Sequence, residues 1–228
     1  MQVVILAAGR GIRMGNHTEL TPKPLLKIKN KTLLEYKLDF LPEKIKEVIL
    51  VVGYRKSDIY QYLGKVYKGI PLRYVEQSDF LGTADALWQA KDILNEHFLV
   101  MMGDDIYHPS DIRSCTEHSF SIGISKVNNL YSGGKVVFDE FNRIKEIKEG
   151  NDHGGVTGYL NTGLYSMTDQ IFSCTQQKLS GKEEWGLPQT LLQLANKKTI
   201  TPVFSRFWLQ ITTPIDLKKA EDFINKYF

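Results

Sequence analysis

Residues 3–15 read Val-Val-Ile-Leu-Ala-Ala-Gly-Arg-Gly-Ile-Arg-Met-Gly, an apolar run that leads directly into a loop of small and basic residues. The first four side chains are all apolar, and three of them are β-branched. This pattern is typical of a strand buried on both faces, as in a sheet with helices on both sides. In such sheets, ligands bind at the carboxyl ends of the strands. The stretch therefore favours an α/β fold with a ligand-binding loop after its first strand.

Similar apolar runs follow at 48–52 and 98–102, each ending at a glycine, and a shorter, peripheral strand is expected at 72–75. Segments of helical spacing lie between them, with Thr32 and Thr83 as the expected caps. Alternating strands and helices predict a single Rossmann-like α/β domain with a mixed, mostly parallel central sheet flanked by helices. The second half predicts strands at 119–127, 135–138 and 156–167, a turn at 132–134, and helices at 187–196 and 214–227.

The composition excludes several classes of protein. The 228 residues carry 29 Lys and Arg against 26 Asp and Glu, and a net charge of +3 is too small and too mixed to indicate nucleic-acid binding. No apolar run approaches the roughly 20 residues that span a bilayer, and the N-terminus has no basic leader. Cys115 and Cys174 form no disulfide scaffold or metal-binding pattern. A cytoplasmic protein without membrane or nucleic-acid partners is expected, and a homo-oligomer is compatible with the sequence.

The loop after the first run has the chemistry of a phosphate site. Gly9 and Gly11 allow positive φ, and consecutive backbone N–H groups from Leu6 onward can surround phosphate oxygens. Arg10 and Arg13 add positive charge. The spacing matches neither G-x-G-x-x-G nor a Walker loop. Taken alone, the loop could equally be a tight turn with solvated arginines.

A second basic motif follows at 21–26, Thr-Pro-Lys-Pro-Leu-Leu. The two prolines stiffen the backbone on either side of Lys23 and restrict where its ammonium group can point. A lysine held in this way near a glycine-rich loop is a reasonable phosphate ligand. The alternative is an exposed lysine in a turn.

These two motifs together resemble those of the sugar nucleotidyltransferases, also called nucleotide-sugar pyrophosphorylases. The matching stretches are Leu-Ala-Ala-Gly-x-Gly-x-Arg-Met in the loop and Thr-Pro-Lys-Pro-Leu after it. The resemblance extends over nearly the whole chain. It implies that the protein joins an NTP to a sugar 1-phosphate and releases pyrophosphate. It also implies one domain over 1–228, with 1–118 mainly binding nucleotide and 119–228 mainly binding the sugar phosphate. The chain ends too early for the β-helix domain that many relatives carry, so no fused acetyltransferase activity is expected.

The loop residues and a second segment are expected to bind the nucleotide. Gln77 offers a donor and an acceptor, Gly82 permits close approach, and Thr83 opens a helix, so that together they could recognise a pyrimidine. The family has a glutamine, four intervening residues and Gly-Thr at this place, and it favours UTP or dTTP here. The expected nucleotide-binding residues are Leu6, Ala7, Ala8, Gly9, Gly11, Gln77, Gly82 and Thr83, with Arg13 and Lys23 as catalytic groups.

A metal site is expected after the run 98–102. Carboxylates beside phosphates are natural Mg²⁺ ligands, and the resemblance assigns the metal to Asp104, with Asp105 as a neighbour. The second metal ligand of the family is an aspartate, but here that position is Gln210. A neutral amide oxygen offsets less charge, which puts metal affinity and catalysis in question.

The resemblance places the sugar phosphate on Gly134, Glu149 and Asn161. The family commonly has Glu-Lys-Pro where this chain has Glu149-Gly150-Asn151. The expected lysine is therefore missing, or Lys145 or Lys148 replaces it. A solvated run of charges is the alternative for this strand.

These features predict an Mg²⁺-dependent nucleotidyltransferase in which the sugar phosphate attacks the α-phosphorus in line. Two alternatives stay open. One is a homologue that binds nucleotide or nucleotide-sugar without catalysis, which Gln210 motivates. The other is a transferase that acts on a small non-sugar phosphate such as phosphocholine.

Overall fold

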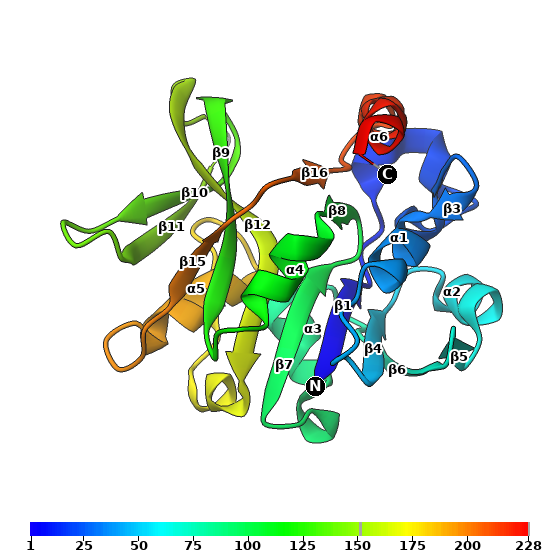
Figure 1. The fold of residues 1–228 in the computed structure, drawn as a ribbon, viewed down its shortest axis with the longest axis horizontal. Helices are drawn as coiled ribbons and strands as arrows, with labels where there is room; N and C mark the ends of the chain where they lie inside the picture. Colours follow the sequence, from blue (N-terminus) through cyan, green and yellow to red (C-terminus); the bar gives the residue numbers. More distant parts are fainter. Residues whose placement is uncertain (151, 228) are drawn as a thin grey trace.

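Within the described residues, 1–150 and 152–227, ten strands form one mixed sheet in the computed structural model (Figure 1). Its order is β11-β10-β12-β7-β1-β4-β6-β5, and β9 pairs with both β12 and β15. The middle strands β7, β1, β4 and β6 are parallel. The predicted α/β class with a mixed central sheet is therefore confirmed. The strands are β1 (Gln2–Ala7), β4 (Glu47–Val52), β5 (Val66–Tyr67), β6 (Ile70–Glu76), β7 (His97–Met102), β9 (Ser121–Leu130), β10 (Gly133–Phe138), β11 (Ile144–Gly150), β12 (Val156–Thr168) and β15 (Thr201–Phe204).

The three apolar runs form β1, β4 and β7 at the centre of the sheet. Val4 lies opposite Ile49 and Val100, and all three side chains are fully buried. Alternate side chains enter two different cores, because successive residues of a strand point to opposite faces. Val4 belongs to one core, and Ile5 belongs to the other. Burial on both faces explains why these strands are apolar throughout.

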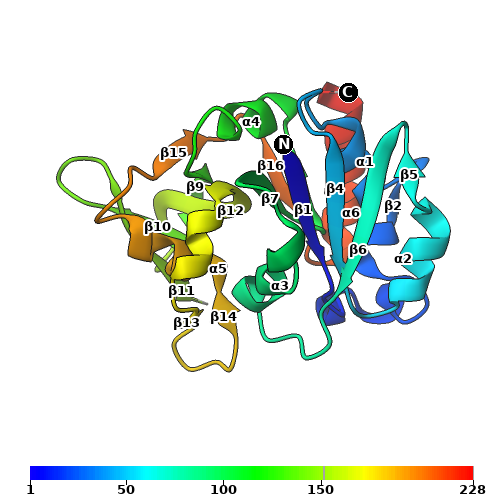
Figure 2. The same cartoon turned by 90° about the horizontal axis from the view of Figure 1, so that it is seen from below.

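Helices cover both faces of the sheet (Figure 2). Helices α3 and α5 pack into the core of Val4, whereas α1, α2 and α4 pack into the core of Ile5. A third cluster joins α6 to α1. The α-helices are α1 (Leu33–Asp39), α2 (Lys56–Leu63), α3 (Thr83–Gln89), α4 (Pro109–Cys115), α5 (Leu187–Leu191) and α6 (Pro214–Tyr227). None of the helices in the described residues has the length and apolar character needed to span a membrane.

Two short hairpins and one pair of strands that are distant in the sequence complete the fold. The strands β2 (Lys27–Ile28) and β3 (Lys31–Thr32) lead into α1, and β13 (Gln177–Lys178) pairs with β14 (Trp185–Gly186). The strands β8 (Asp105–Tyr107) and β16 (Trp208–Gln210) pair antiparallel, with Gln210 opposite Asp105. This last pair brings the end of the chain back beside the loop that follows β7.

Several predicted boundaries and caps were wrong. The strand predicted at 119–127 begins at Ser121, and both glycines of the predicted turn lie in β10. The predicted helix at 187–196 is α5 followed by a 3₁₀ segment, Leu192–Leu194. Gly82, not Thr83, is the N-cap residue of α3, and the Thr83 hydroxyl instead accepts a hydrogen bond from the Leu187 amide at 3.0 Å. Thr83 therefore ties α3 to α5, which the local sequence could not indicate.

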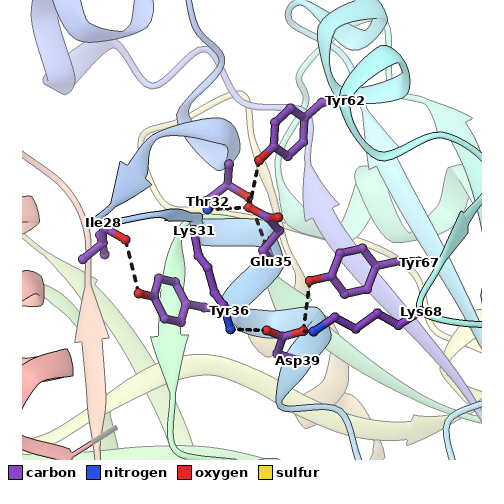
Figure 3. A network of polar contacts seen from close by, with 9 residues as sticks. All are labelled: Ile28, Lys31, Thr32, Glu35, Tyr36, Asp39, Tyr62, Tyr67 and Lys68. Atoms are coloured by element: carbon purple, nitrogen blue, oxygen red, sulfur yellow. Dashed lines mark hydrogen bonds and ion pairs between the residues drawn. The ribbon is translucent and has the colours of Figure 1, made fainter.

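A polar network holds α1 against α2 and β5 (Figure 3). Asp39 accepts hydrogen bonds from Lys31, Lys68 and Tyr67. Burial alone would raise the pKa of Asp39, but these hydrogen bonds outweigh it and hold the pKa below its ordinary value. The network fixes α1 and α2 at the β5 end of the sheet.

The predicted cap at Thr32 is confirmed as a capping box: Thr32 Oγ1 accepts from the Glu35 amide, and Glu35 accepts from the Thr32 amide. We expect Thr32→Ala to reduce the free energy of unfolding by about 1 kcal/mol, since it leaves amide donors of the first turn unpaired. Urea unfolding measures this loss. Thr157→Ala, on the exposed part of β12, is the control and should change stability by less than half as much; equal losses would contradict the assignment.

Candidate active site

A first cavity of about 700 Å³ opens at the carboxyl ends of β1 and β7. This is the position at which α/β sheets bind ligands. Its lining combines the first loop, the segment around Lys23, the start of α3 and the residues after β7. Every residue predicted to bind the nucleotide or to act in catalysis contributes to the lining: Leu6, Ala7, Ala8, Gly9, Gly11, Arg13, Lys23, Gln77, Gly82 and Thr83, together with Asp104.

The first loop is shaped by Gly11. Its φ is +66°, and a Cβ on this residue would lie 3.0 Å from the Lys23 Cβ. The positive φ expected at Gly9 is not present, whereas Gly15, beyond the loop, does have one. The chain then continues as a 3₁₀ helix (Ile12–Thr18) whose last residue donates from Oγ1 to the Gly11 carbonyl. The Thr18 hydroxyl thus ties the end of this segment back to the loop.

Lys23 and Asp104 meet inside this cavity. Pro22 is the N-cap residue and Pro24 the second residue of a short 3₁₀ turn, and the Lys23 side chain between them is 7% exposed. Its Nζ lies 2.5 Å from Asp104 Oδ2. The Asp104 side chain is 36% exposed, so one carboxylate oxygen is fixed while the group still faces the cavity. The alternative of an exposed lysine in a turn is therefore wrong, and Lys23 lines the cavity.

Gln77 and Gly82 form the other end of the cavity. Gln77 is buried, and its Nε2 donates to the Gly82 carbonyl at 3.0 Å and to Asp85 Oδ2 at 2.7 Å. Both amide hydrogens are therefore engaged, and Oε1 is the atom that this side chain offers to a ligand. Phe80, which sequence reasoning missed, also lines the cavity and lies 5.5 Å below the Arg10 guanidinium.

Gly82 lies directly against the β13–β14 hairpin, since a Cβ there would come 2.5 Å from the Trp185 carbonyl oxygen at a φ of +99°. We expect Gly82→Ala to lower the free energy of unfolding by about 2 kcal/mol or more, because it combines backbone strain with a clash. Gly69→Ala is the control: its φ is +87°, but a Cβ there would meet open space. Urea unfolding that gave equal losses for the two variants would contradict this contact.

A second cavity of about 230 Å³ adjoins the first and shares Thr83, Met102 and Glu184 with it. The three residues predicted to bind the sugar phosphate, together with Gln210, all line it: Gly134, Glu149, Asn161 and Gln210. Glu149 packs against Gly134, on which a Cβ would come 2.8 Å from its Oε1. The Asn161 amide is partly engaged, because its Nδ2 donates to the Tyr165 hydroxyl and its Oδ1 accepts from the Gly163 amide.

The sequence analysis did not identify the basic side chain that lines the second cavity. Lys145 and Lys148 do not line it, and Lys148 instead approaches Glu146 at 3.4 Å. The lysine in the lining is Lys182, on the turn between β13 and β14. No motif marks this turn, which is held at the site by long-range contacts such as the hydrogen bond from the Trp185 amide to the Leu81 carbonyl. Asn151, where the family pattern has a proline, lies outside the described residues.

A charged cluster lies behind the junction of the two cavities. Burial lowers the pKa of Lys37 to about 8, against the attraction of Asp105 and Asp104. Burial and the neighbouring Asp104 raise the pKa of Asp105, while a hydrogen bond from Trp208 and the charges of Lys37 and Lys23 oppose that rise. Two carboxylates and two ammonium groups thus share one poorly solvated region. Lys37 was not predicted at all, because in the sequence it is one lysine among many.

The donor set for a metal is limited. In the part of the chain that the structure describes, no group of three or more His, Cys, Asp or Glu side chains is placed to hold an ion. Asp104 lines the first cavity, whereas Gln210 lines the second. A single carboxylate in a cavity lined by basic side chains still fits Mg²⁺, which proteins bind through one or two carboxylates together with substrate phosphates.

Comparison with known proteins gives consistent matches over the whole chain. The chain is 28% identical to the bifunctional protein GlmU of Methanocaldococcus jannaschii, covering 100% of this chain and 54% of that protein. It is also 28% identical to UTP–glucose-1-phosphate uridylyltransferase AglF of Haloferax volcanii (97% and 95% covered) and to D-glycero-alpha-D-manno-heptose 1-phosphate guanylyltransferase of Aneurinibacillus thermoaerophilus (100% of both). The chain thus spans about half the length of its GlmU relatives.

The fold of the chain also matches those of solved structures. A Bacillus anthracis structure assigned as a glucose-1-phosphate thymidylyltransferase superposes with a TM-score of 0.86 at 22% identity, covering 100% of this chain and 96% of that one. The sequence pattern that defines the family described as Nucleotidyl transferase matches residues 2–226. The chain therefore belongs to the nucleotidyl transferase family.

Proposed function

We propose that the chain transfers a nucleotidyl group from a nucleoside triphosphate to a sugar 1-phosphate and releases pyrophosphate. The observation that carries this proposal is the pair of adjoining cavities. The first has a backbone cradle beside Arg13 and Lys23, as a triphosphate requires. The second has oxygen acceptors suited to hydroxyl groups, among them Glu149. The lining that the two cavities share supports a mechanism in which an acceptor phosphate lies next to the nucleotide.

In this mechanism the chain mainly positions charge. The amides of the first loop and Arg13 hold the β- and γ-phosphates and stabilise the leaving pyrophosphate. Lys23 contacts the α-phosphate and the incoming phosphate oxygen, so that the two are aligned for in-line displacement. Asp104, with Gln210 as an added neutral ligand, would hold Mg²⁺. When bound, the ion would offset phosphate charge during transfer.

The proposed nucleotide is UTP or dTTP. With its Nε2 engaged, Gln77 presents an acceptor, which fits the ring N3–H of uracil or thymine. Cytosine and adenine have no ring N–H at the corresponding position of their pairing edge. Guanine has one at N1, and one relative is a guanylyltransferase. GTP is therefore the competitor that a test must include.

The proposal is tested by incubating the protein with Mg²⁺, each of UTP, dTTP, GTP, CTP and ATP, and a panel of sugar 1-phosphates, and measuring pyrophosphate. Release with UTP or dTTP and a hexose 1-phosphate supports it. A second function, nucleotide binding without catalysis, is favoured by Gln210, which brings no carboxylate. Nucleotide-dependent stabilisation with no pyrophosphate on any acceptor would establish that function instead.

A further inference from the structure

The side chain of Gln77 is pinned to the start of α3. Gln77 directly follows β6, and its backbone amide donates to the Val52 carbonyl at 2.9 Å. Its side-chain Nε2 donates to the Gly82 carbonyl at 3.0 Å and to Asp85 Oδ2 at 2.7 Å. An amide nitrogen has two hydrogens to donate. Both are used inside the protein, so only Oε1 is left for a ligand.

The Oε1 atom of Gln77 is open to the first cavity. The residue lines this cavity, although only 4% of it is exposed. Among the described residues, no protein group donates to this oxygen, and yet it is not one of the enclosed side-chain atoms that lack a partner. Oε1 therefore retains accessible surface, which a ligand in the first cavity can reach.

Both partners of Nε2 can only accept hydrogen bonds. The carbonyl of Gly82, the N-cap residue of α3, also accepts from the Ala86 amide at 3.1 Å, so the helix fixes its direction. An ionised carboxylate likewise has no hydrogen to donate. If the Gln77 amide turned over, Oε1 would face two acceptors and Nε2 would lose both hydrogen bonds. The two partners thus decide which end of the amide a ligand meets.

Asp85 is itself held in place. It is the third residue of α3, and its Oδ1 accepts from Gln89 Nε2 at 3.2 Å, one helical turn further on. Asp85 lines neither cavity, so it can act on a ligand only through Gln77. A charged acceptor forms a stronger hydrogen bond than a neutral carbonyl does. Asp85 therefore contributes more to the orientation of Gln77 than Gly82 does.

The end of the amide that faces the cavity decides which bases fit. Uracil and thymine carry a hydrogen on ring N3, and guanine carries one on ring N1, so each can donate to Oε1. The same ring atoms of cytosine and adenine are acceptors, which would meet Oε1 with no hydrogen between them. A site built around a hydrogen bond strongly rejects a ligand that cannot form it. UTP with CTP, and GTP with ATP, are therefore matched probes of the Gln77 amide.

We infer that Asp85 is a positioning residue for base recognition. By holding the Gln77 amide with Oε1 toward the first cavity, it makes that cavity select triphosphates whose base has a ring N–H over those whose base has a ring acceptor. The inference rests on the proposed function, because it requires the base to lie against Gln77. It adds that the choice of base depends on a residue that the ligand does not touch.

The test compares kcat/KM for UTP with CTP, and for GTP with ATP, at a saturating sugar 1-phosphate. The pair that contains the fastest triphosphate gives the selectivity ratio. In Asp85→Ala, water beside Gln77 can donate as well as accept, so the amide can turn over. The ratio is expected to fall by about tenfold or more, the factor of a hydrogen bond to a charged group, with no change in the KM for sugar phosphate.

The matched control is Asp92→Ala, an exposed aspartate shortly after α3 that lines neither cavity. It should keep the wild-type ratio. Asp85→Asn retains a neutral acceptor, so its ratio should fall by a smaller factor, and this variant carries the test if Asp85→Ala does not fold. A wild-type ratio in either folded Asp85 variant would overturn the inference.

A double-mutant cycle shows whether Asp85 acts through Gln77. Gln77→Met removes the amide, so adding Asp85→Ala to this variant should leave the selectivity ratio unchanged. A purely structural role of Asp85 would lower the ratio by the same factor with and without the amide. That outcome would overturn the inference.

A binding measurement separates this inference from the proposed function. If no pyrophosphate is released, thermal shift with the same triphosphates is compared in wild type and Asp85→Ala. Greater stabilisation of the wild type by UTP than by CTP, or by GTP than by ATP, with a smaller difference in the variant, supports the inference although catalysis fails. An equal difference in both proteins, or none in the wild type, overturns the inference alone. Stabilisation by no triphosphate overturns it together with the nucleotide-binding part of the proposed function.

Discussion

Lys23→Ala is expected to lower turnover by about a hundredfold or more. Loss of one preorganised group that stabilises developing charge has an effect of this size. Lys23 is held between two prolines with its ammonium group on Asp104, so water cannot readily replace it at the same point. Pyrophosphate release under saturating substrates measures the loss.

The matched control is Lys27→Ala, an exposed lysine of β2 four residues further on that lines neither cavity. It should retain wild-type turnover. A Lys23→Ala protein that releases pyrophosphate as fast as Lys27→Ala would contradict the catalytic assignment. An unfolded Lys23→Ala protein would show instead that the ion pair serves stability, and Lys23→Arg, which keeps the charge but changes its geometry, would then carry the test.

Lys37→Met is expected to reduce the free energy of unfolding by about 3 kcal/mol at pH 7. Removing one member of a buried charged cluster leaves its partner uncompensated, which is costly. Lys37 is fully buried, and the charges that attract it are those of Asp105 and Asp104. Lys65→Met, the same substitution at an exposed site, should have little effect. Urea unfolding measures both.

The double variant Lys37→Met/Asp105→Asn tests whether these charges are coupled. Its loss of stability should be smaller than the sum of the two single losses, since removing both charges leaves neither one unpaired. Additive losses would contradict the coupling.

The pH dependence of stability provides an independent check on Lys37. Its pKa is about 8 in the folded protein against an ordinary value of 10.5. Between these values the unfolded chain binds more protons, so the stability of the wild type should rise with pH relative to that of Lys37→Met. A difference between the two proteins that stays constant from pH 8 to pH 10 would contradict the burial of a charged lysine.

The parts of the fold that were predicted depend on local patterns. β1, β4 and β7 are uniformly apolar because they are buried on both faces, and Thr32 caps α1 through a residue three positions away. The lining of the first cavity was predictable for the same reason, since most of it comes from short motifs after these strands. The α6 boundaries also followed from the proline at its start.

The parts that were missed depend on long-range pairing. Lys182 and Glu184 reach the cavities through long-range contacts, among them the hydrogen bond from Trp185 to Leu81, about a hundred residues earlier. Asp105 and Gln210 line the second cavity together because of the register of β8 on β16, which no local pattern encodes. The hydrogen bond between the Leu187 amide and the Thr83 hydroxyl also joins residues that are distant in the sequence. Such contacts are set by the tertiary fold and appear in the sequence as ordinary polar residues.

The central claim is that the first loop and Lys23 hold the triphosphate across from Asp104. A crystal structure with Mg²⁺ and a non-hydrolysable UTP analogue tests it most directly. We expect the β- and γ-phosphates on the amides between Gly9 and Arg13, the α-phosphate beside Lys23, and the base against Gln77. A triphosphate bound at another place, with the first cavity empty at saturating nucleotide, would contradict the account.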